Sequence, residues 1–198
     1  MLHADLIAFS IFAWIGSFTP GPNVAIAATT GVHHGLRAAL PQVAGVPLGF
    51  VAMMWAVGMG GATLLQGHPV LLQAMKLAGN AYLLYLAWNL CRSDRLSAAP
   101  LIQPFSLSRA ALFQVVNPKA WMMLVAATST YAIGREDFLA RMLWMSLGFA
   151  IPSALSLLTW AWMGERLRGW LLVGQRLRRF NLTMGAALAL TAAWMLSL

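Results

Sequence analysis

Pro20-Gly21-Pro22-Asn23 interrupts the first long apolar run of this chain, and Asn117-Pro118-Lys119 interrupts a later one. The second break follows the first by 96 to 98 residues in a chain of 198. Hydrocarbon offers no water for backbone groups that a broken helix leaves unpaired, so such a break persists only inside protein or beside a polar cavity. Interrupted spans at matching places in two halves are typical of a transporter's substrate site.

The composition is that of a membrane protein. Hydrophobic residues make up 60% of the chain, charged residues only 9%, and the mean hydropathy is +0.72. A soluble domain carries about 25% charged residues to face water. The net charge of +8 does not indicate a nucleic-acid partner, because the basic residues lie between apolar runs and form no stripe. Cationic loops beside anionic lipid explain the same charge.

The N-terminal apolar stretch is predicted to be a retained first span. The stretch from Leu6 to Phe18 lacks a basic leading region, and the Pro-Gly-Pro break stands where a signal peptide would have its cleavage site. The single cysteine, Cys91, excludes an internal disulfide, and no Cys/His spacing indicates a metal site. His33 and His34 are adjacent and diverge on a helix, so we expect neither a metal nor a cofactor.

The sequence predicts an all-α integral membrane protein with about six transmembrane helices, because a helix needs about 20 mostly apolar residues to cross the hydrocarbon. We expect one transmembrane domain over residues 1–198, with halves at about 1–91 and 109–198 joined by a cytoplasmic loop at 92–108. The six predicted spans are Asp5–Thr30, Ala38–Gln66, Val70–Leu90, Ala110–Ile133, Phe138–Met163 and Phe180–Leu198.

Basic residues predict which way the spans point, because cytoplasmic loops are enriched in Lys and Arg. The first, third and fifth connections with their flanks carry nine basic residues, against three for the others. Both termini are therefore predicted to lie outside. The nine residues are Arg37, Arg92, Arg95, Arg109, Arg166, Arg168, Arg176, Arg178 and Arg179.

Two further features of the topology follow from the pattern. Because three is odd, two three-span halves enter the membrane in opposite senses, so related halves form an inverted 3+3 repeat with broken helices 1 and 4. The stretch from Gly164 to Arg179 mixes leucines and a tryptophan with arginines. Two interpretations of it stay open: a short amphipathic helix on the inner membrane surface, or a solvated basic linker.

The first break has the chemistry to hold a zwitterion. Pro20 and Pro22 leave carbonyls about one turn upstream without donors, and Gly21 lets the chain unwind between them. The exposed half-helix ends then present N–H groups that favour an anion and carbonyls that favour a cation. Asn23 can donate and accept. The alternative interpretation is a proline kink packed against neighbouring helices.

The second break places a cation inside its span. Lys119 lies about nine residues into the fourth span, or about 14 Å at 1.5 Å per residue. An ammonium there costs about 2.5–3.5 kcal/mol on insertion scales. The five acidic residues all fall in connections or at a span's outer end. Its partner is therefore a carbonyl at a break, a lipid phosphate or, as we favour, a substrate carboxylate.

These residues predict a substrate-binding site with no catalytic residue and no metal. The predicted set is Pro20, Gly21, Pro22, Asn23, Asn117, Pro118 and Lys119. Secondary candidates are Thr19, beside the first break, and Lys76, near the outer end of the third span, where it could instead snorkel or pair with Asp5.

The breaks and their surroundings resemble the LysE/RhtB-type amino acid exporters, a family of lysine, threonine and homoserine exporter-like proteins. Ser17-Phe18-Thr19-Pro20-Gly21-Pro22-Asn23 is similar to the family's N-terminal signature, and Asn117-Pro118-Lys119-Ala120 to its fourth-span motif. The glycines after the first break and the stretch from Lys76 to Leu86 also resemble family elements. The resemblance covers the whole chain.

The resemblance implies a multi-pass carrier of the bacterial inner membrane that exports amino acids or related small metabolites. The second span lacks the acidic residue that a cationic side chain would need, so a neutral side chain is expected. A homodimer is a candidate assembly for so small a carrier.

Three other functional classes have their own sequence requirements. An intramembrane enzyme needs Ser with His, paired Asp or paired Cys within the spans, and these are missing, so no enzyme is expected. A channel needs a continuous polar lining. A non-transporting structural or accessory membrane protein is the remaining alternative, in which both breaks would be packing kinks.

Overall fold

The computed structural model describes residues 2–19, 21–61, 69–92 and 103–196. Within these ranges the chain is helical and contains no strand, as predicted. The elements are α1 (Leu2–Phe18), α2 (Pro22–His34), α3 (Leu36–Ala56), the π-helical turn η1 (Val57–Gly61), α5 (Pro69–Arg92), α6 (Leu107–Val116), α7 (Pro118–Tyr131), α8 (Phe138–Leu171) and α9 (Arg176–Leu196).

Both predicted breaks separate two helices. α1 and α2 are bent by 47° relative to each other, and α6 and α7 by 72°. Each second helix has a proline, Pro22 or Pro118, in its first turn, where the missing N–H and the preset φ are compatible with a helix start. The Asn117 side chain caps α7 by accepting a hydrogen bond from the Lys119 backbone N–H at 3.2 Å. Pro20 lies outside the described residues.

Two helical stretches are by themselves long and apolar enough to cross a membrane: Leu36–Gly60 and Phe138–Leu171. Two more spans result if each bent pair is counted as one. The described residues therefore contain two to four candidate spans, and the count of six remains a prediction.

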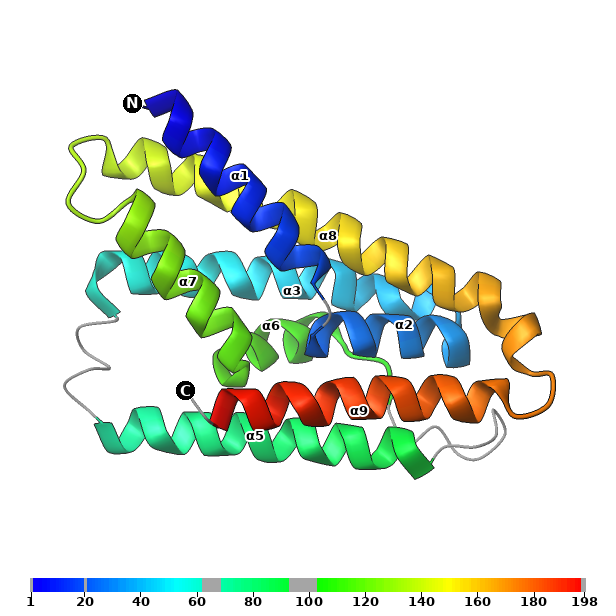
Figure 1. Ribbon diagram of the computed structural model, residues 1–198. Helices are drawn as coiled ribbons and strands as arrows, with labels where there is room; N and C mark the ends of the chain where they lie inside the picture. Colours follow the sequence, from blue (N-terminus) through cyan, green and yellow to red (C-terminus); the bar gives the residue numbers. More distant parts are fainter. Residues whose placement is uncertain (1, 20, 62–68, 93–102, 197–198) are drawn as a thin grey trace.

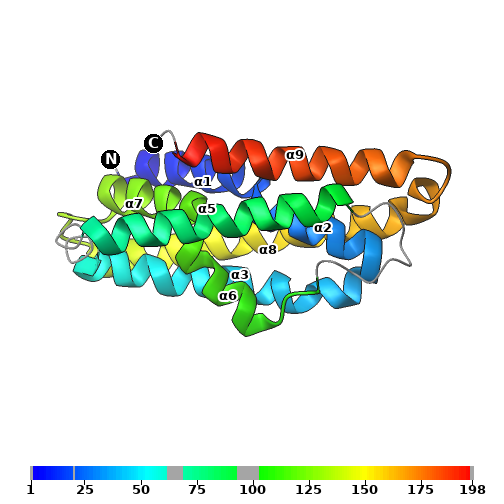
Figure 2. The same ribbon diagram turned by 90° about the horizontal axis from the view of Figure 1, so that it is seen from below.

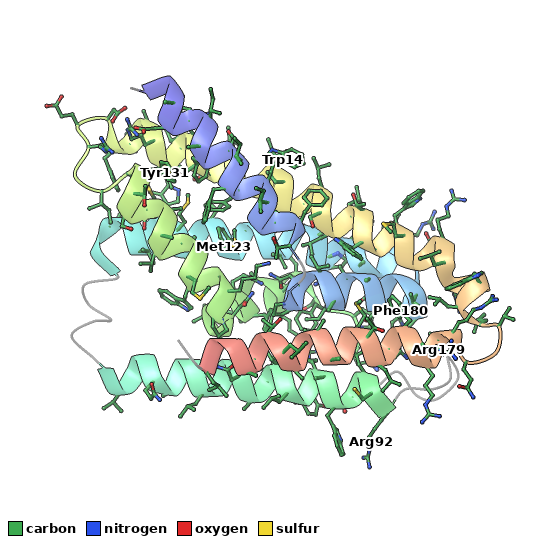
Figure 3. The ribbon with its side chains drawn as sticks, in the orientation of Figure 1. Trp14, Arg92, Met123, Tyr131, Arg179 and Phe180 are labelled. Carbon is green, nitrogen blue, oxygen red and sulfur yellow. The ribbon has the colours of Figure 1, made fainter. Side chains whose placement is uncertain are left out.

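The helices form an elongated bundle (Figures 1 and 2). α2 and α3 pack on α8, α6 packs on α3, and α5 lies beside α9. The start of α1 and the end of α9 lie at the same end of the bundle, on the left of Figure 1. Arg92 and Arg179 lie at the opposite end (Figure 3). The start of α1 and the end of α9 are thus separated from this pair of arginines along the bundle axis.

Glycines bring α2 and α8 into backbone contact. A Cβ atom at Gly31 would overlap the carbonyl of Ala161, and one at Gly164 would overlap the carbonyl of Ala28. Without a large hydrophobic drive between helices in lipid, such close packing is a main source of helix association. The reciprocal pair therefore sets how α2, the second half of the broken span, sits against α8.

α6 lies deeper in the bundle than the sequence suggested. Gly45 and Gly49 of α3 lie against the α6 backbone. Arg109, which flanks the predicted third connection, lies in the first turn of α6, where its Nη2 donates to the Tyr82 hydroxyl at 2.9 Å. α6, which is 10 residues long, therefore begins beside the middle of α3 and α5.

The basic stretch after Gly164 is neither a separate surface helix nor a linker. α8 continues to Leu171, and α9 begins at Arg176. The reversal between them includes Gly174 at φ 63°, a conformation that glycine adopts without a steric penalty. Nothing in the sequence before Leu171 stops a helix, which is why α8 extends past the predicted end at Met163.

An ion-pair network joins α1, α7 and α8. The buried Arg141 donates to the Asp5 carboxylate at 3.1 Å, to the Asp137 carboxylate at 2.6 Å and to the Tyr131 carbonyl at 3.0 Å. Asp5 thus has a partner, Arg141, that the sequence did not predict. The Lys76 side chain itself lies outside the described residues.

This network predicts a loss of stability in acid. The hydrogen bond from Arg141 is the main cause that holds the pKa of the Asp137 carboxyl below its usual range. A carboxyl with a lowered pKa in the folded state stabilises it above the ordinary pKa of aspartate, and this contribution disappears as the pH falls through the lowered pKa. Between about pH 6 and about pH 3, the Tm in detergent should fall further for the wild type than for Asp137→Asn. Equal decreases would contradict the prediction.

Candidate functional site

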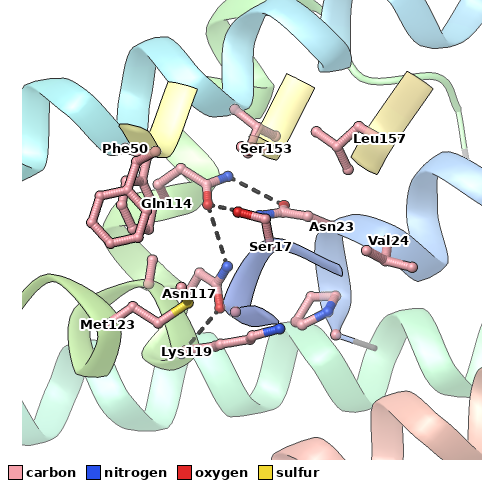
Figure 4. A pocket seen from close by; sticks show the side chains of 16 residues that line it. Ser17, Asn23, Val24, Phe50, Gln114, Asn117, Lys119, Met123, Ser153 and Leu157 are labelled. Atoms are coloured by element: carbon pink, nitrogen blue, oxygen red, sulfur yellow. Dashed lines mark hydrogen bonds between the residues drawn. The ribbon is translucent and has the colours of Figure 1, made fainter. Parts of the chain in front are cut away.

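The two breaks meet inside the bundle. The Asn23 amide Nδ2 donates to the Gln114 Oε1 at 2.9 Å, and the Gln114 Nε2 donates back to the Asn23 Oδ1 at 3.3 Å. Asn117 Nδ2 also donates to Gln114 Oε1, at 3.3 Å. Figure 4 shows this chain of amides, which ends at Lys119. Residues that are 91 apart in sequence thus join the start of α2 to the end of α6.

Lys119 reaches across to the first break. Its Nζ donates to the Thr19 backbone carbonyl at 2.8 Å, just after α1 ends at Phe18. Of the three possible partners of the Lys119 ammonium, the structure therefore contains the backbone carbonyl at a break. Gly21 makes room for this contact, because a Cβ there would lie 3.1 Å from the Lys119 side chain. The Thr19 hydroxyl is used locally and donates to the Ile15 carbonyl at 2.6 Å.

Two buried glutamines belong to the site and were not selected from the sequence. Gln114 and Gln42 are both fully buried. Gln42 Nε2 donates to the Asn23 backbone carbonyl at 2.9 Å, and Gln114 Nε2 also reaches the Ala110 carbonyl at 2.8 Å. An amide within an apolar span is a usable signal, since unsatisfied polar groups are costly in hydrocarbon. Gln114 also lies one turn before Asn117, on the same helix face.

A cavity of about 50 Å³ lies between these groups. Its polar side is formed by Ser17, Asn23, Gln114, Asn117, Lys119 and Ser153, and its apolar side includes Val46, Phe50, Met123, Phe149 and Leu157. No acidic side chain is among the described residues that line it. The ammonium of Lys119 is therefore the one formal charge among the described lining residues.

Helix ends add partial charges to the cavity. α2 and α7 begin at the two breaks, while α1 and α6 end there. Helix N-termini favour negative charge and C-termini favour positive charge. The Thr19 carbonyl, at the end of α1, meets the ammonium in keeping with this rule. The cavity thus presents a fixed cation and both kinds of helix end, which suits a ligand that carries one charge of each sign.

Most of the predicted site residues come together here. Gly21, Pro22, Asn23, Asn117 and Lys119 line the cavity, and Thr19 takes part through its carbonyl. Pro118 starts α7 and is not part of the lining. Pro20 and the Lys76 side chain lie outside the described residues. In the described ranges, no group of three or more His, Cys, Asp or Glu residues could hold a metal ion.

Comparison with known families tests the resemblance that the motifs suggested. The family model described as LysE type translocator matches residues 14–197. The chain belongs to the LysE type translocator family. The predicted family is thereby confirmed, and with its apolar helices this translocator is a multi-pass membrane protein.

Curated relatives of this translocator are named as efflux proteins. It is 30% identical over 171 residues to a cysteine/O-acetylserine efflux protein of Klebsiella pneumoniae, covering 86% of this chain and 87% of that protein. It is 28% identical over 160 residues to the cysteine/O-acetylserine efflux protein of Escherichia coli strain K12, with 81% and 82% covered. No solved structure matches the translocator significantly.

Proposed function

We propose that this translocator exports small amino acids with uncharged side chains across the bacterial inner membrane. The observation that carries the proposal is the meeting of both helix breaks at one cavity, where Lys119 faces no carboxylate among the described lining residues. Ionisable residues within spans mark substrate pathways by default. A substrate carboxylate is the partner that this ammonium lacks.

The geometry supports a simple exchange of partners on binding. The substrate carboxylate takes the place of the Thr19 carbonyl, 2.8 Å from the Lys119 Nζ. The N-termini of α2 and α7 reinforce the attraction for an anion. The Thr19 carbonyl, once released, is free to accept a hydrogen bond from the substrate's ammonium group. Binding thus replaces one ammonium–carbonyl contact with two contacts. The substrate carboxylate meets the Lys119 ammonium, and the substrate ammonium meets the Thr19 carbonyl.

The rest of the lining favours a small uncharged side chain. Phe50, Phe149 and Met123 form an apolar wall, and a cationic side chain would find no counter-charge in the described lining. Cysteine and O-acetylserine, the compounds in the names of the relatives, carry uncharged side chains at neutral pH. We assign the chain no enzymatic activity, in line with those efflux names.

The proposed carrier has six spans in an inverted 3+3 repeat, with both termini outside. The two bent helix pairs, α1 with α2 and α6 with α7, support related halves. The cavity of about 50 Å³ has room for a few water molecules, since one water needs about 10–15 Å³ of such space. An amino acid therefore enters only after lining helices separate, as alternating access requires.

Counterflow into proteoliposomes tests the proposal. Vesicles that contain the purified full-length protein are loaded with unlabelled L-cysteine and reductant, or with O-acetyl-L-serine, and diluted into the labelled compound. We expect labelled cysteine and O-acetylserine to accumulate, and labelled L-lysine not to accumulate in lysine-loaded vesicles. Equal lysine counterflow would overturn the substrate class. Absence of counterflow for all three would favour a non-transporting accessory protein.

A further inference from the structure

An open surface groove lies on another face of α6. This groove of about 410 Å³ runs between α5 and α6. Along α6 it is lined by Arg109, Leu112, Phe113 and Val116, which are spaced so that they share one helix face. The residues of α6 that take part in the amide cluster, Ala110 and Gln114, project from a neighbouring face. α6 is thus the wall between the groove and the central cavity.

The guanidinium of Arg109 lies in the groove and contacts two aromatic residues. Arg109 Nη2 donates to the Tyr82 hydroxyl at 2.9 Å, and its Cζ lies 4.5 Å from the centre of the Phe105 ring. Neither ion pair found among the described residues includes Arg109. A guanidinium has five N–H donors in a planar fork, and one of them meets Tyr82. The geometry suits bidentate recognition of a carboxylate.

Arg109 lies beside the middle of α5 and α3, far from the ends of those two helices. Tyr82 lies ten residues before the end of α5 at Arg92, about 15 Å at 1.5 Å per residue. A Cβ at Gly45, nine residues into α3, would overlap the Leu107 carbonyl at the start of α6. Arg109 is nevertheless exposed. An exposed cation at such a depth faces a water-filled cavity or a partner, and it marks a substrate pathway by default.

We propose that this groove is a second substrate subsite, in which Arg109 holds the carboxylate of the amino acid before it reaches Lys119. This inference rests on the proposed function. Ligand sites commonly occupy about 300–1,000 Å³, so the groove has room for a small amino acid. α6 and α5 are in contact where the Val116 carbonyl meets Gly79. The approach is so close that a Cβ at Gly79 would overlap that carbonyl. Movement of α6 away from α5 at this contact joins the groove to the central cavity.

Transport kinetics in phosphatidylcholine vesicles provide the first test, with L-cysteine under reductant as the probe. Arg109→Gln should raise KM about tenfold or more, as the loss of a charge-assisted hydrogen bond predicts, with Vmax changed by less than about twofold. Arg109→Lys should recover part of the affinity. Arg178→Gln, which removes an exposed arginine at the start of α9, is the matched control and should leave KM unchanged. Tyr82→Phe removes only the hydroxyl that accepts a hydrogen bond from Arg109. It replaces Arg109→Gln as the test variant if Arg109→Gln does not fold.

Equilibrium binding separates the two subsites. Lys119→Met should retain weak cysteine binding. We expect 3-mercaptopropionate, which keeps the carboxylate, to displace this bound cysteine. Cysteamine, which lacks the carboxylate, should not displace it. Adding Arg109→Gln should remove this remaining binding. An unchanged KM in Arg109→Gln, in a wild type that transports cysteine, would overturn the subsite alone. A wild type that neither binds nor transports any amino acid would overturn the proposed function as well.

Other occupants of the groove give different results. If an anionic lipid headgroup binds Arg109, the Arg109→Gln effect appears only in vesicles that contain phosphatidylglycerol. If a second copy of the chain covers the groove, the variant changes the oligomeric mass in detergent and leaves cysteine affinity unchanged. Either result would overturn the subsite.

Discussion

Lys119→Met should abolish amino acid counterflow while leaving membrane insertion intact. Removing the ammonium takes away the proposed partner of the substrate carboxylate at the meeting point of the breaks. Truncating one member of a buried, hydrogen-bonded charge pair costs about 2–5 kcal/mol, so we expect cysteine transport to fall about a hundredfold or more. Initial rates in proteoliposomes, normalised to the amount of inserted protein, measure the effect.

Two variants make this result specific to the site. Lys119→Arg keeps the charge but changes its shape and reach, so it should keep part of the activity. Arg178→Met removes an exposed cation far along the chain from both breaks and should transport like the wild type. Wild-type rates in Lys119→Met would remove Lys119 from the transport site and leave the proposal without its central contact.

Gly31→Ala should destabilise the protein strongly, and Gly31→Val should prevent correct folding. A Cβ at Gly31 overlaps the Ala161 carbonyl, so even one methyl group forces α2 and α8 apart. Overpacking of this kind costs about 1–3 kcal/mol for small insertions and more for larger ones. The Tm in detergent and the monodispersity on size-exclusion chromatography should both fall, Val more than Ala.

Gly169 of α8 offers the matched control. A Cβ there would meet no other atom within 4 Å. Gly169→Ala should therefore raise stability slightly, because alanine favours a helix over glycine by about 1 kcal/mol. If Gly31→Ala and Gly169→Ala have the same Tm, the close approach of α2 and α8 does not limit stability.

The breaks and their cation were predictable because their causes are local. Proline removes an N–H and fixes φ whatever surrounds it, so the starts of α2 at Pro22 and α7 at Pro118 follow from single residues. The place of Lys119 at the second break likewise follows from the chain itself, because Asn117-Pro118-Lys119 are consecutive residues. The predicted end of α8 at Met163 was wrong, since composition alone does not end a helix that lacks a stop signal.

Hydrogen-bond and ion-pair partners on different helices were not predictable, because they depend on which helices pack against each other. Asp5 pairs with Arg141 because α1 packs on α8, a contact between residues 136 apart in sequence. Gln114 and Gln42 look like isolated amides along the chain and become a cluster only when α3 and α6 meet the break at Asn23.

The sequence by itself determined that the chain belongs in a membrane and where two of its helices break, because apolar length and proline chemistry act through near neighbours along the chain. Only the tertiary structure decided that the breaks face each other, that Lys119 rests on the Thr19 carbonyl, and that Arg109 lies beside the middle of α5. These depend on glycine contacts between helices far apart in sequence, which fix register and depth through packing that no local pattern encodes.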